Sequence, residues 1–143
     1  MSAAGPTQIP SQTFDEYWLW ARSPTRGFQG GQRTGKWMLF YDKSVLDEKW
    51  AMVRQMVEQD RLGGLAKCST ALGNSNATSA KTGVIIVYTP DYQNQEEVYE
   101  VAVTLHETMQ YHRTMYYKSD EQTLAGVYAK HGSTKNHIYR YPL

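Results

Sequence analysis

The feature that most constrains the fold is one run of apolar residues that reads as a β-strand buried on both faces. Residues Val84–Thr89 form the most apolar stretch of the chain, and Pro90 follows it. A strand that lacks polar alternation is typical of the middle of a sheet, because half-exposed strands carry polar residues on one face. We therefore predict that this segment is a central strand.

Two other segments repeat apolar residues at helical spacing, so each is expected to bury one face. The first covers about residues 45–57, with Asp42 or Ser44 as its N-cap, Trp50 in its apolar stripe and Gly63-Gly64 as its stop. The second covers about residues 95–110. Both helices are expected to pack on the sheet that holds the apolar strand.

The remaining elements are assigned from local patterns. Thr13 and Glu16 resemble a capping box and predict a helix over about residues 14–22, ended by Pro24. Residues 1–12 are expected to be a disordered lead before a single α+β domain over residues 13–143. Aromatic and apolar runs predict strands at Lys36–Tyr41, Leu65–Thr70, Met115–Lys118 and Leu124–Lys130, and a possible edge strand at Ile138–Tyr141.

These elements favour an α+β fold with one mixed or mainly antiparallel sheet, helices on one face and the other face partly open. At 143 residues the chain is long enough for one ordinary hydrophobic core. Its net charge is only +1, so any binding of nucleic acid must come from a local cluster of basic residues.

Several classes of function are disfavoured by composition. The single cysteine, Cys68, excludes an internal disulfide and a cysteine-rich zinc site, and the four histidines lack the spacing of metal ligands, so no cofactor is expected. No stretch approaches the ~20 apolar residues of a spanning helix. The N-terminus has no signal-peptide pattern. We expect no membrane association and a cytoplasmic or nuclear location.

Residues 30–36 spell G-x-x-x-x-G-K, the first part of a phosphate-binding loop. That motif requires Ser or Thr after the lysine and a helix after the loop, whereas Trp37 and a strand follow here. Nucleotide hydrolysis by this route is therefore rejected.

Four short motifs occur in an order that resembles a known family. They are Gly35–Phe40, Ala66–Thr70, Val87–Asp91 and Tyr117–Asp120, the last followed by Thr123, Gly126 and Tyr128. In this order and spacing they are similar to the basophilic-leukemia-expressed protein family, an uncharacterised family whose fold is similar to that of the mRNA-cap-binding translation initiation factor. The resemblance covers roughly residues 14–128 and fades after Lys130.

This resemblance implies a curved sheet backed by helices. In the cap-binding relatives, the concave side holds a methylated guanine between two tryptophans and its phosphates against basic side chains. A site built partly from the C-terminus cannot be carried over to this chain, because the match ends before it.

The candidate site follows from strand alternation. Side chains of Lys67 and Ser69 share one face of their strand, and Lys118 can share that face from another strand. Converging lysines repel each other unless carboxylates or a bound anion compensate them, and Asp91 and Asp120 are the nearby carboxylates. We predict phosphate binding by Lys67, Ser69, Lys118 and Arg33, and stacking by Trp37, Tyr88, Tyr117 or Tyr128.

Three functions remain open at this point. The first is a binding module for a phosphorylated ligand, either a nucleotide or an RNA end, on the open sheet face. The second is a metal-independent phosphodiesterase in which a lysine stabilises charge and Tyr117 or a histidine moves the proton. The third is a protein-interaction domain that uses a helix face or an edge strand. The two lysines could also be salt-bridged residues on a solvated face.

Overall fold

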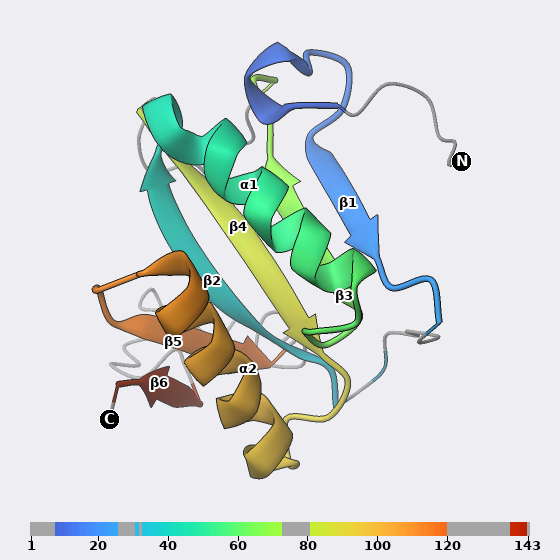
Figure 1. Cartoon of the computed structure of the whole chain (residues 1–143), viewed down its shortest axis with the longest axis vertical. Coiled ribbons are helices and arrows are strands. Elements are labelled where there is room, and N and C mark those ends of the chain that lie inside the picture. Colours follow the sequence, from blue (N-terminus) through green and yellow to red (C-terminus); the bar gives the residue numbers. More distant parts are fainter. Residues whose placement is uncertain (1–7, 26–30, 32, 73–80, 120–137, 143) are drawn as a thin grey trace, which may run out of the picture.

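The computed structural model describes residues 8–25, 31, 33–72, 81–119 and 138–142. Within these residues, six antiparallel strands form one sheet in the order β1-β3-β4-β2-β5-β6, and two long helices pack against it (Figure 1). In chain order the elements are the 3₁₀ helix η1 Pro10–Gln12, β1 Trp18–Arg22, β2 Gly35–Asp42, α1 Lys43–Glu58, β3 Leu65–Ser69, β4 Thr82–Thr89, α2 Gln95–Met109, β5 Met115–Ser119 and β6 Tyr139–Tyr141.

The apolar strand lies in the middle of the sheet, as predicted. β4 pairs with β3 on one side and with β2 on the other. Its side chains are buried on both faces, with Ile85 and Val87 fully buried toward the helices and Ile86 and Tyr88 less than a tenth exposed on the opposite face. Burial on both faces explains why this strand shows no polar alternation.

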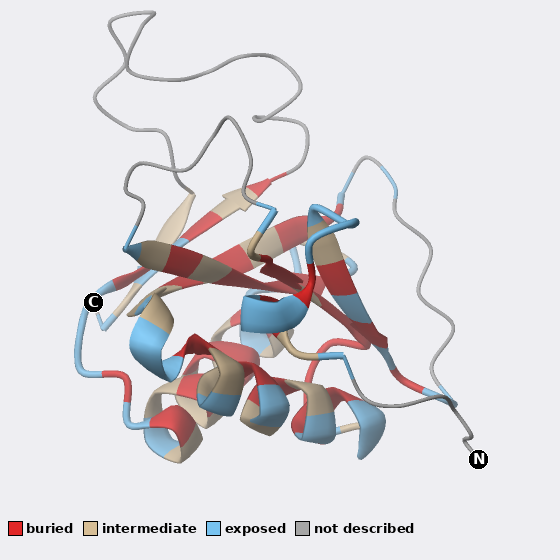
Figure 2. Ribbon diagram, turned by 90° about the horizontal axis from the view of Figure 1, so that it is seen from above, coloured by how far each residue is buried: buried red, intermediate tan, exposed pale blue. Residues whose placement is uncertain are grey.

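Both helices cover the same face of the sheet, and Figure 2 shows them together on one side of it. The Asp42 side chain caps α1 by accepting a hydrogen bond from the Ser44 amide at 2.8 Å. The helix ends at Glu58, before the predicted Gly63-Gly64 stop, because Asp60 takes a left-handed conformation with φ of 61°. α2 begins after the Asn94 cap, close to its predicted start.

The predicted helix over residues 14–22 is wrong, since residues 18–22 form strand β1. Leu19 and Ala21 are buried under the helices, whereas Trp20 and Arg22 are exposed, which is the alternation of a strand. Pairing with β3 therefore outweighs the local capping pattern. The Thr13 hydroxyl donates to the Ile9 carbonyl instead of capping a helix.

The last residues of the predicted disordered lead are ordered. Residues 10–12 form η1, and both the amide and the hydroxyl of Ser11 donate to the Asp47 carboxylate on α1. These bonds tie the segment before β1 to the helix layer. Residues 1–7 lie outside the described residues.

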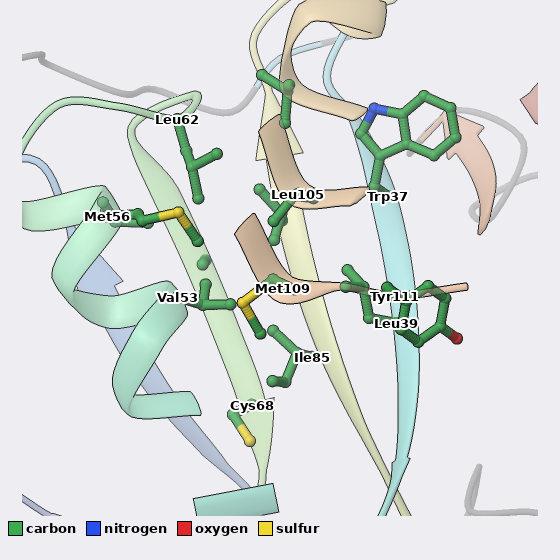
Figure 3. Packing of buried hydrophobic residues seen from close by; sticks show 14 of the residues in the cluster. Trp37, Leu39, Val53, Met56, Leu62, Cys68, Ile85, Leu105, Met109 and Tyr111 are labelled. Carbon is green, nitrogen blue, oxygen red and sulfur yellow. The ribbon is translucent and has the colours of Figure 1, made fainter. Parts of the chain in front are cut away.

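The main hydrophobic core lies between the helices and the sheet (Figure 3). Trp50, predicted to be a core residue, is 2% exposed, and Trp37 on β2 is fully buried. The predicted edge strand at Ile138–Tyr141 is present as β6, whereas the predicted strand Leu124–Lys130 lies outside the described residues. None of the described helices is long and apolar enough to cross a membrane.

Candidate functional site

The sheet face that points away from the helices carries the candidate site, and we call it the open face. Strand register defines its residues, because side chains that alternate with the buried set lie on the opposite side. Its residues are Trp18, Trp20 and Arg22 of β1, Leu65, Lys67 and Ser69 of β3, Val84, Ile86 and Tyr88 of β4, Lys36, Met38 and Phe40 of β2, Tyr116 and Lys118 of β5, and Arg140 of β6.

Charge is segregated between this face and the helices. The six described strands contain five basic residues, all on the open face, and a single carboxylate, Asp42, at the end of β2. The two long helices contain seven carboxylates and three basic residues. A chain that is nearly neutral overall therefore has a basic sheet face and an acidic helix face, a distribution that favours anions on the sheet side.

Two lysines face each other at the centre of this basic area. Lys36 of β2 and Lys118 of β5 are directly opposite across the two strands. Burial, followed by the positive charge of Lys36, holds the pKa of Lys118 below its ordinary value. Like charges in this position destabilise a sheet, and a bound anion would offset their repulsion.

A second cation lies among aromatic rings near the β1 edge. The Lys67 ammonium is 4.1 Å from the ring centroid of Trp18, 5.2 Å from that of Trp20 and 5.7 Å from that of Tyr88. The Arg22 guanidinium carbon is 5.9 Å from the Trp20 ring. Cation–π attraction of this kind holds the positive charge on the face while leaving part of the Trp20 ring exposed.

The predicted pairing of Lys67 with Lys118 needs correction. Both lie on the open face, as strand alternation predicted, but β4 and β2 lie between their strands. Three strand spacings separate their backbones by roughly 14 Å. The close partner of Lys118 is Lys36, which was not among the predicted site residues. Ser69 also lies on this face, but it is buried and its hydroxyl accepts a hydrogen bond from the Val84 amide at 3.0 Å.

Two of the predicted stacking residues lie on the wrong face. Trp37 and Tyr117 are fully buried toward the helices. The Trp37 indole donates to the Val98 carbonyl at 2.9 Å, and the Tyr117 hydroxyl lies 2.6 Å from the Thr89 hydroxyl. Neither ring offers a surface to a ligand, so both are structural residues. Tyr88 does lie on the open face, largely buried near Lys67.

The loop arginine is paired with a carboxylate. Arg33 precedes β2 and forms an ion pair with Asp91 at 3.6 Å, with its side chain 62% exposed. Asp91, which we expected to compensate Lys67 or Lys118, therefore pairs with Arg33. Asp120 and the predicted stacking residue Tyr128 lie outside the described residues.

The exposed aromatic residues of this face were not predicted from the sequence. Trp20 is 47% exposed on β1, and Tyr116 is 40% exposed on β5. Alternation of exposed and buried residues in Trp18–Arg22 could have identified Trp20. It was not recognised because this segment was predicted to be helical. Lys36 could be recognised only once the pairing of β2 with β5 was known.

The described histidines lie away from this face. The ring of His106, on α2, is 6.2 Å from that of His112 and 5.4 Å from that of Tyr141, at the C-terminal end of the helix. Neither belongs to the open-face set, so among the residues that the structure describes no histidine is placed beside Lys67 or Lys118. Within the same residues, no group of three or more His, Cys, Asp or Glu side chains is arranged to hold a metal.

Comparisons with known proteins agree with this architecture. The family model described as basophilic leukemia-expressed protein Bles03 matches residues 28–125. Among curated proteins, none matches the chain.

Several solved structures share the fold. Ascaris suum eIF4E-3 in complex with m7G cap has a TM-score of 0.55 and 14% identity, over 78% of this chain and 58% of that one. Schistosome eIF4E with m7GpppA and 4E-BP gives 0.54 and 11%, over 76% and 58%. C. elegans eIF4E-3 with the 4E-binding protein Mextli gives 0.53 and 12%, over 64% and 55%. The chain thus spans less than two thirds of these proteins, and at such identities the likeness establishes the fold alone.

Proposed function

This chain belongs to the basophilic leukemia-expressed protein family, and we propose that it is a binding module for a phosphorylated ligand, a nucleotide or an RNA end, on the open face of its sheet. The observation that carries the proposal is the segregation of charge. Five basic side chains occupy the open face, while carboxylates predominate on the helices behind it. An anion is therefore attracted to one side of the molecule and repelled from the other.

The opposed pair Lys36 and Lys118 is the proposed phosphate site. Two ammonium groups on adjacent strands can contact different oxygens of one phosphate, and the bound charge would remove their mutual repulsion. Lys67 supplies a further cation toward β1. Arg33, beside Asp91, remains part of the proposal as a peripheral contact, whereas Ser69 is buried and its hydroxyl already accepts from the Val84 amide.

The comparisons support this proposal at the level of the fold. The structures of Ascaris eIF4E-3 and schistosome eIF4E were solved with cap nucleotides. Those ligands contain a purine and phosphates, the two groups that aromatic rings and lysines recognise. Their identity with this chain is too low to carry over the cap itself.

Titration of intrinsic tryptophan fluorescence with a panel of nucleotides, at 50 and 200 mM salt, tests the proposal. If lysines hold the phosphates, affinity should be clearly lower at the higher salt concentration, because salt screens the attraction between exposed charges. Lys36→Ala and Lys118→Ala should each weaken binding, whereas Lys43→Ala on α1 should not. The phosphate site is rejected if no nucleotide gives a salt-sensitive change in fluorescence. It is also rejected if neither Lys36→Ala nor Lys118→Ala reduces that change. Conversion of a nucleotide to product in the presence of a metal chelator would instead favour a metal-independent phosphodiesterase.

A second candidate, a protein-interaction domain, is favoured by the sheet edge. β1 is an edge strand among the described elements, and the two residues Phe14 and Tyr17 beside it are 68% and 55% exposed. An edge strand beside exposed rings can accept another strand. Chemical crosslinking to a bound protein would place the contacts at residues 14–22 if this candidate is correct. Crosslinks confined to α1 or α2 would reject it.

A further inference from the structure

We infer that the ligand of the open face is single-stranded nucleic acid that crosses the strands from β1 to β5 and stacks bases on Trp20 and Tyr116. This inference rests on the proposed function, because it requires the basic open face to bind phosphate. It adds the class of ligand, its direction across the sheet and two stacking residues that no sequence motif identified.

Two aromatic rings of the open face are exposed. Of the aromatic residues in the described strands, only Trp20 and Tyr116 are exposed, at 47% and 40%. A flat exposed ring can stack on any base, because every base has a π-face. An acidic peptide, which also suits a basic surface, has no comparable planar group in its carboxylates.

The two rings belong to one row of side chains across the sheet. Strand register puts Trp20 opposite Lys67, Lys67 opposite Ile86, Ile86 opposite Met38, and Met38 opposite Tyr116. Four strand spacings separate the ends of this row, so the two backbones are about 19 Å apart. A mononucleotide cannot reach both rings, whereas a strand of about four nucleotides is comparable in size to the smallest single-strand sites.

Positive charges lie along this row on every strand that it crosses except β4. Arg22 and Lys67 lie beside the Trp20 ring, at 5.9 and 5.2 Å from its centroid. Lys36 and Lys118 are opposite each other on the same face. They lie two residues along β2 and β5 from Met38 and Tyr116. Arg140 lies opposite Tyr116 on β6. A phosphate backbone that joins the two rings would therefore pass basic side chains at both ends and near the middle.

The same arrangement disfavours a duplex. Base pairing and stacking inside a duplex hide the faces of the bases, so the exposed rings would have no partner. Stacking on rings beside a basic track is the way in which proteins bind single strands with little sequence preference. We therefore expect tolerance of base sequence.

Fluorescence anisotropy with labelled oligoadenylate and oligouridylate of two, four and eight nucleotides tests the inference. Affinity should rise steeply from two to four nucleotides and only slightly beyond, and an eight-base-pair duplex should bind at least tenfold more weakly than the eight-nucleotide strands. Trp20→Leu, which keeps an apolar side chain beside Lys67, should weaken binding of the eight-nucleotide strands about tenfold, as expected for the loss of one stacked base. Trp20→Phe should retain most of the affinity, and Tyr116→Leu should resemble Trp20→Leu.

Two controls separate this inference from the proposed function. Val45→Ala removes an exposed apolar side chain from the helix face and should leave every affinity unchanged. Titration with ATP measures binding at the phosphate site by itself. The affinity for ATP should be reduced by Lys36→Ala but not by Trp20→Leu. Circular dichroism of each variant establishes that it is folded.

The outcomes are distinct. Binding of ATP that depends on Lys36, together with oligonucleotide affinity that is independent of length and of Trp20, would overturn the single-strand inference and leave the proposed function intact. A duplex that binds as tightly as the single strand would also overturn it. If neither ATP nor any oligonucleotide binds with salt sensitivity, both the inference and the proposed function fail.

Discussion

Lys36 and Lys118 lie directly opposite each other on neighbouring strands, and the charge of Lys36 contributes to the lowered pKa of Lys118. Two like charges in this position oppose folding of the sheet. A bound anion would offset this repulsion. The stability of the unliganded protein and its affinity for phosphate should therefore respond to substitution in opposite directions.

Lys36→Ala and Lys118→Ala are each expected to leave the free energy of unfolding unchanged or to raise it, by up to about 1 kcal/mol. Removal of one charge relieves repulsion and opens no cavity. Urea denaturation measures this change, and nucleotide titration measures the accompanying loss of affinity. The double variant should lose less binding free energy than the sum of the single losses, because both lysines contact one ligand. A loss of stability above 1 kcal/mol in either single variant would show that the lysine has a structural role.

The pH dependence of stability has a definite sign. The pKa of Lys118 is lowered in the folded protein, first by burial and then by Lys36, so the unfolded chain binds more protons between the folded pKa and the ordinary lysine value. Stability contributed by this group therefore increases as pH rises through that interval, and the cost of burying its charge is fully present at neutral pH.

Comparison with Lys118→Met isolates this contribution. The variant should be more stable than the wild type at neutral pH, and the difference should shrink as pH approaches the ordinary lysine pKa. Thermal unfolding of both proteins at several alkaline pH values measures this difference in stability. The contributions of other titrating groups are common to both proteins and cancel. A constant difference across this range would show that Lys118 is not the titrating group. Affinity for phosphate should fall over the same interval because Lys118 loses its proton.

Two tryptophans should affect stability and not binding. Trp50 is 2% exposed and Trp37 fully buried. Trp50→Ala should cost about 3–5 kcal/mol through the cavity that it leaves. Trp37→Phe keeps an aromatic ring but leaves the Val98 carbonyl without its indole donor, at a cost of about 1–3 kcal/mol. Chemical denaturation measures both losses of stability. A changed ligand affinity in folded Trp37→Phe would show that Trp37 contributes to binding.

The sequence predicted the fold well where local pattern and tertiary structure agree. Both long helices and the central strand β4 follow from apolar periodicity, because burial dictates that periodicity. β1 was mistaken for a helix because a capping pattern at Thr13 and Glu16 is local, whereas its pairing with β3 joins segments far apart in the chain.

The site was predicted only in part for the same reason. Alternation along one strand correctly put Lys67 and Lys118 on one face, since a side chain's direction depends on its own strand. Which residues are neighbours across that face depends on strand order, which is not a local property. The order places β4 and β2 between the two lysines and brings Lys36 to Lys118 instead.

Gly35 provides a test of whether the glycine-rich segment before β2 serves phosphate binding or packing. A Cβ atom at this position would lie 2.1 Å from the hydroxyl oxygen of Tyr117 and 2.3 Å from the ring carbon that bears it. The Tyr117 ring is fully buried and cannot move easily into solvent. Gly35→Ala should therefore destabilise the protein by about 1–3 kcal/mol through overpacking.

A double-mutant cycle with Tyr117→Ala separates packing from binding. Tyr117→Ala alone should cost about 3–5 kcal/mol, because it leaves a cavity. In the double variant the new methyl group enters that cavity, so the total loss should be at least 0.5 kcal/mol smaller than the sum of the two single losses. Urea denaturation of the four proteins measures this coupling. The packing explanation is rejected if the losses are additive and Gly35→Ala leaves stability unchanged. If Gly35→Ala then abolishes nucleotide binding, the glycine is needed for close approach of phosphate.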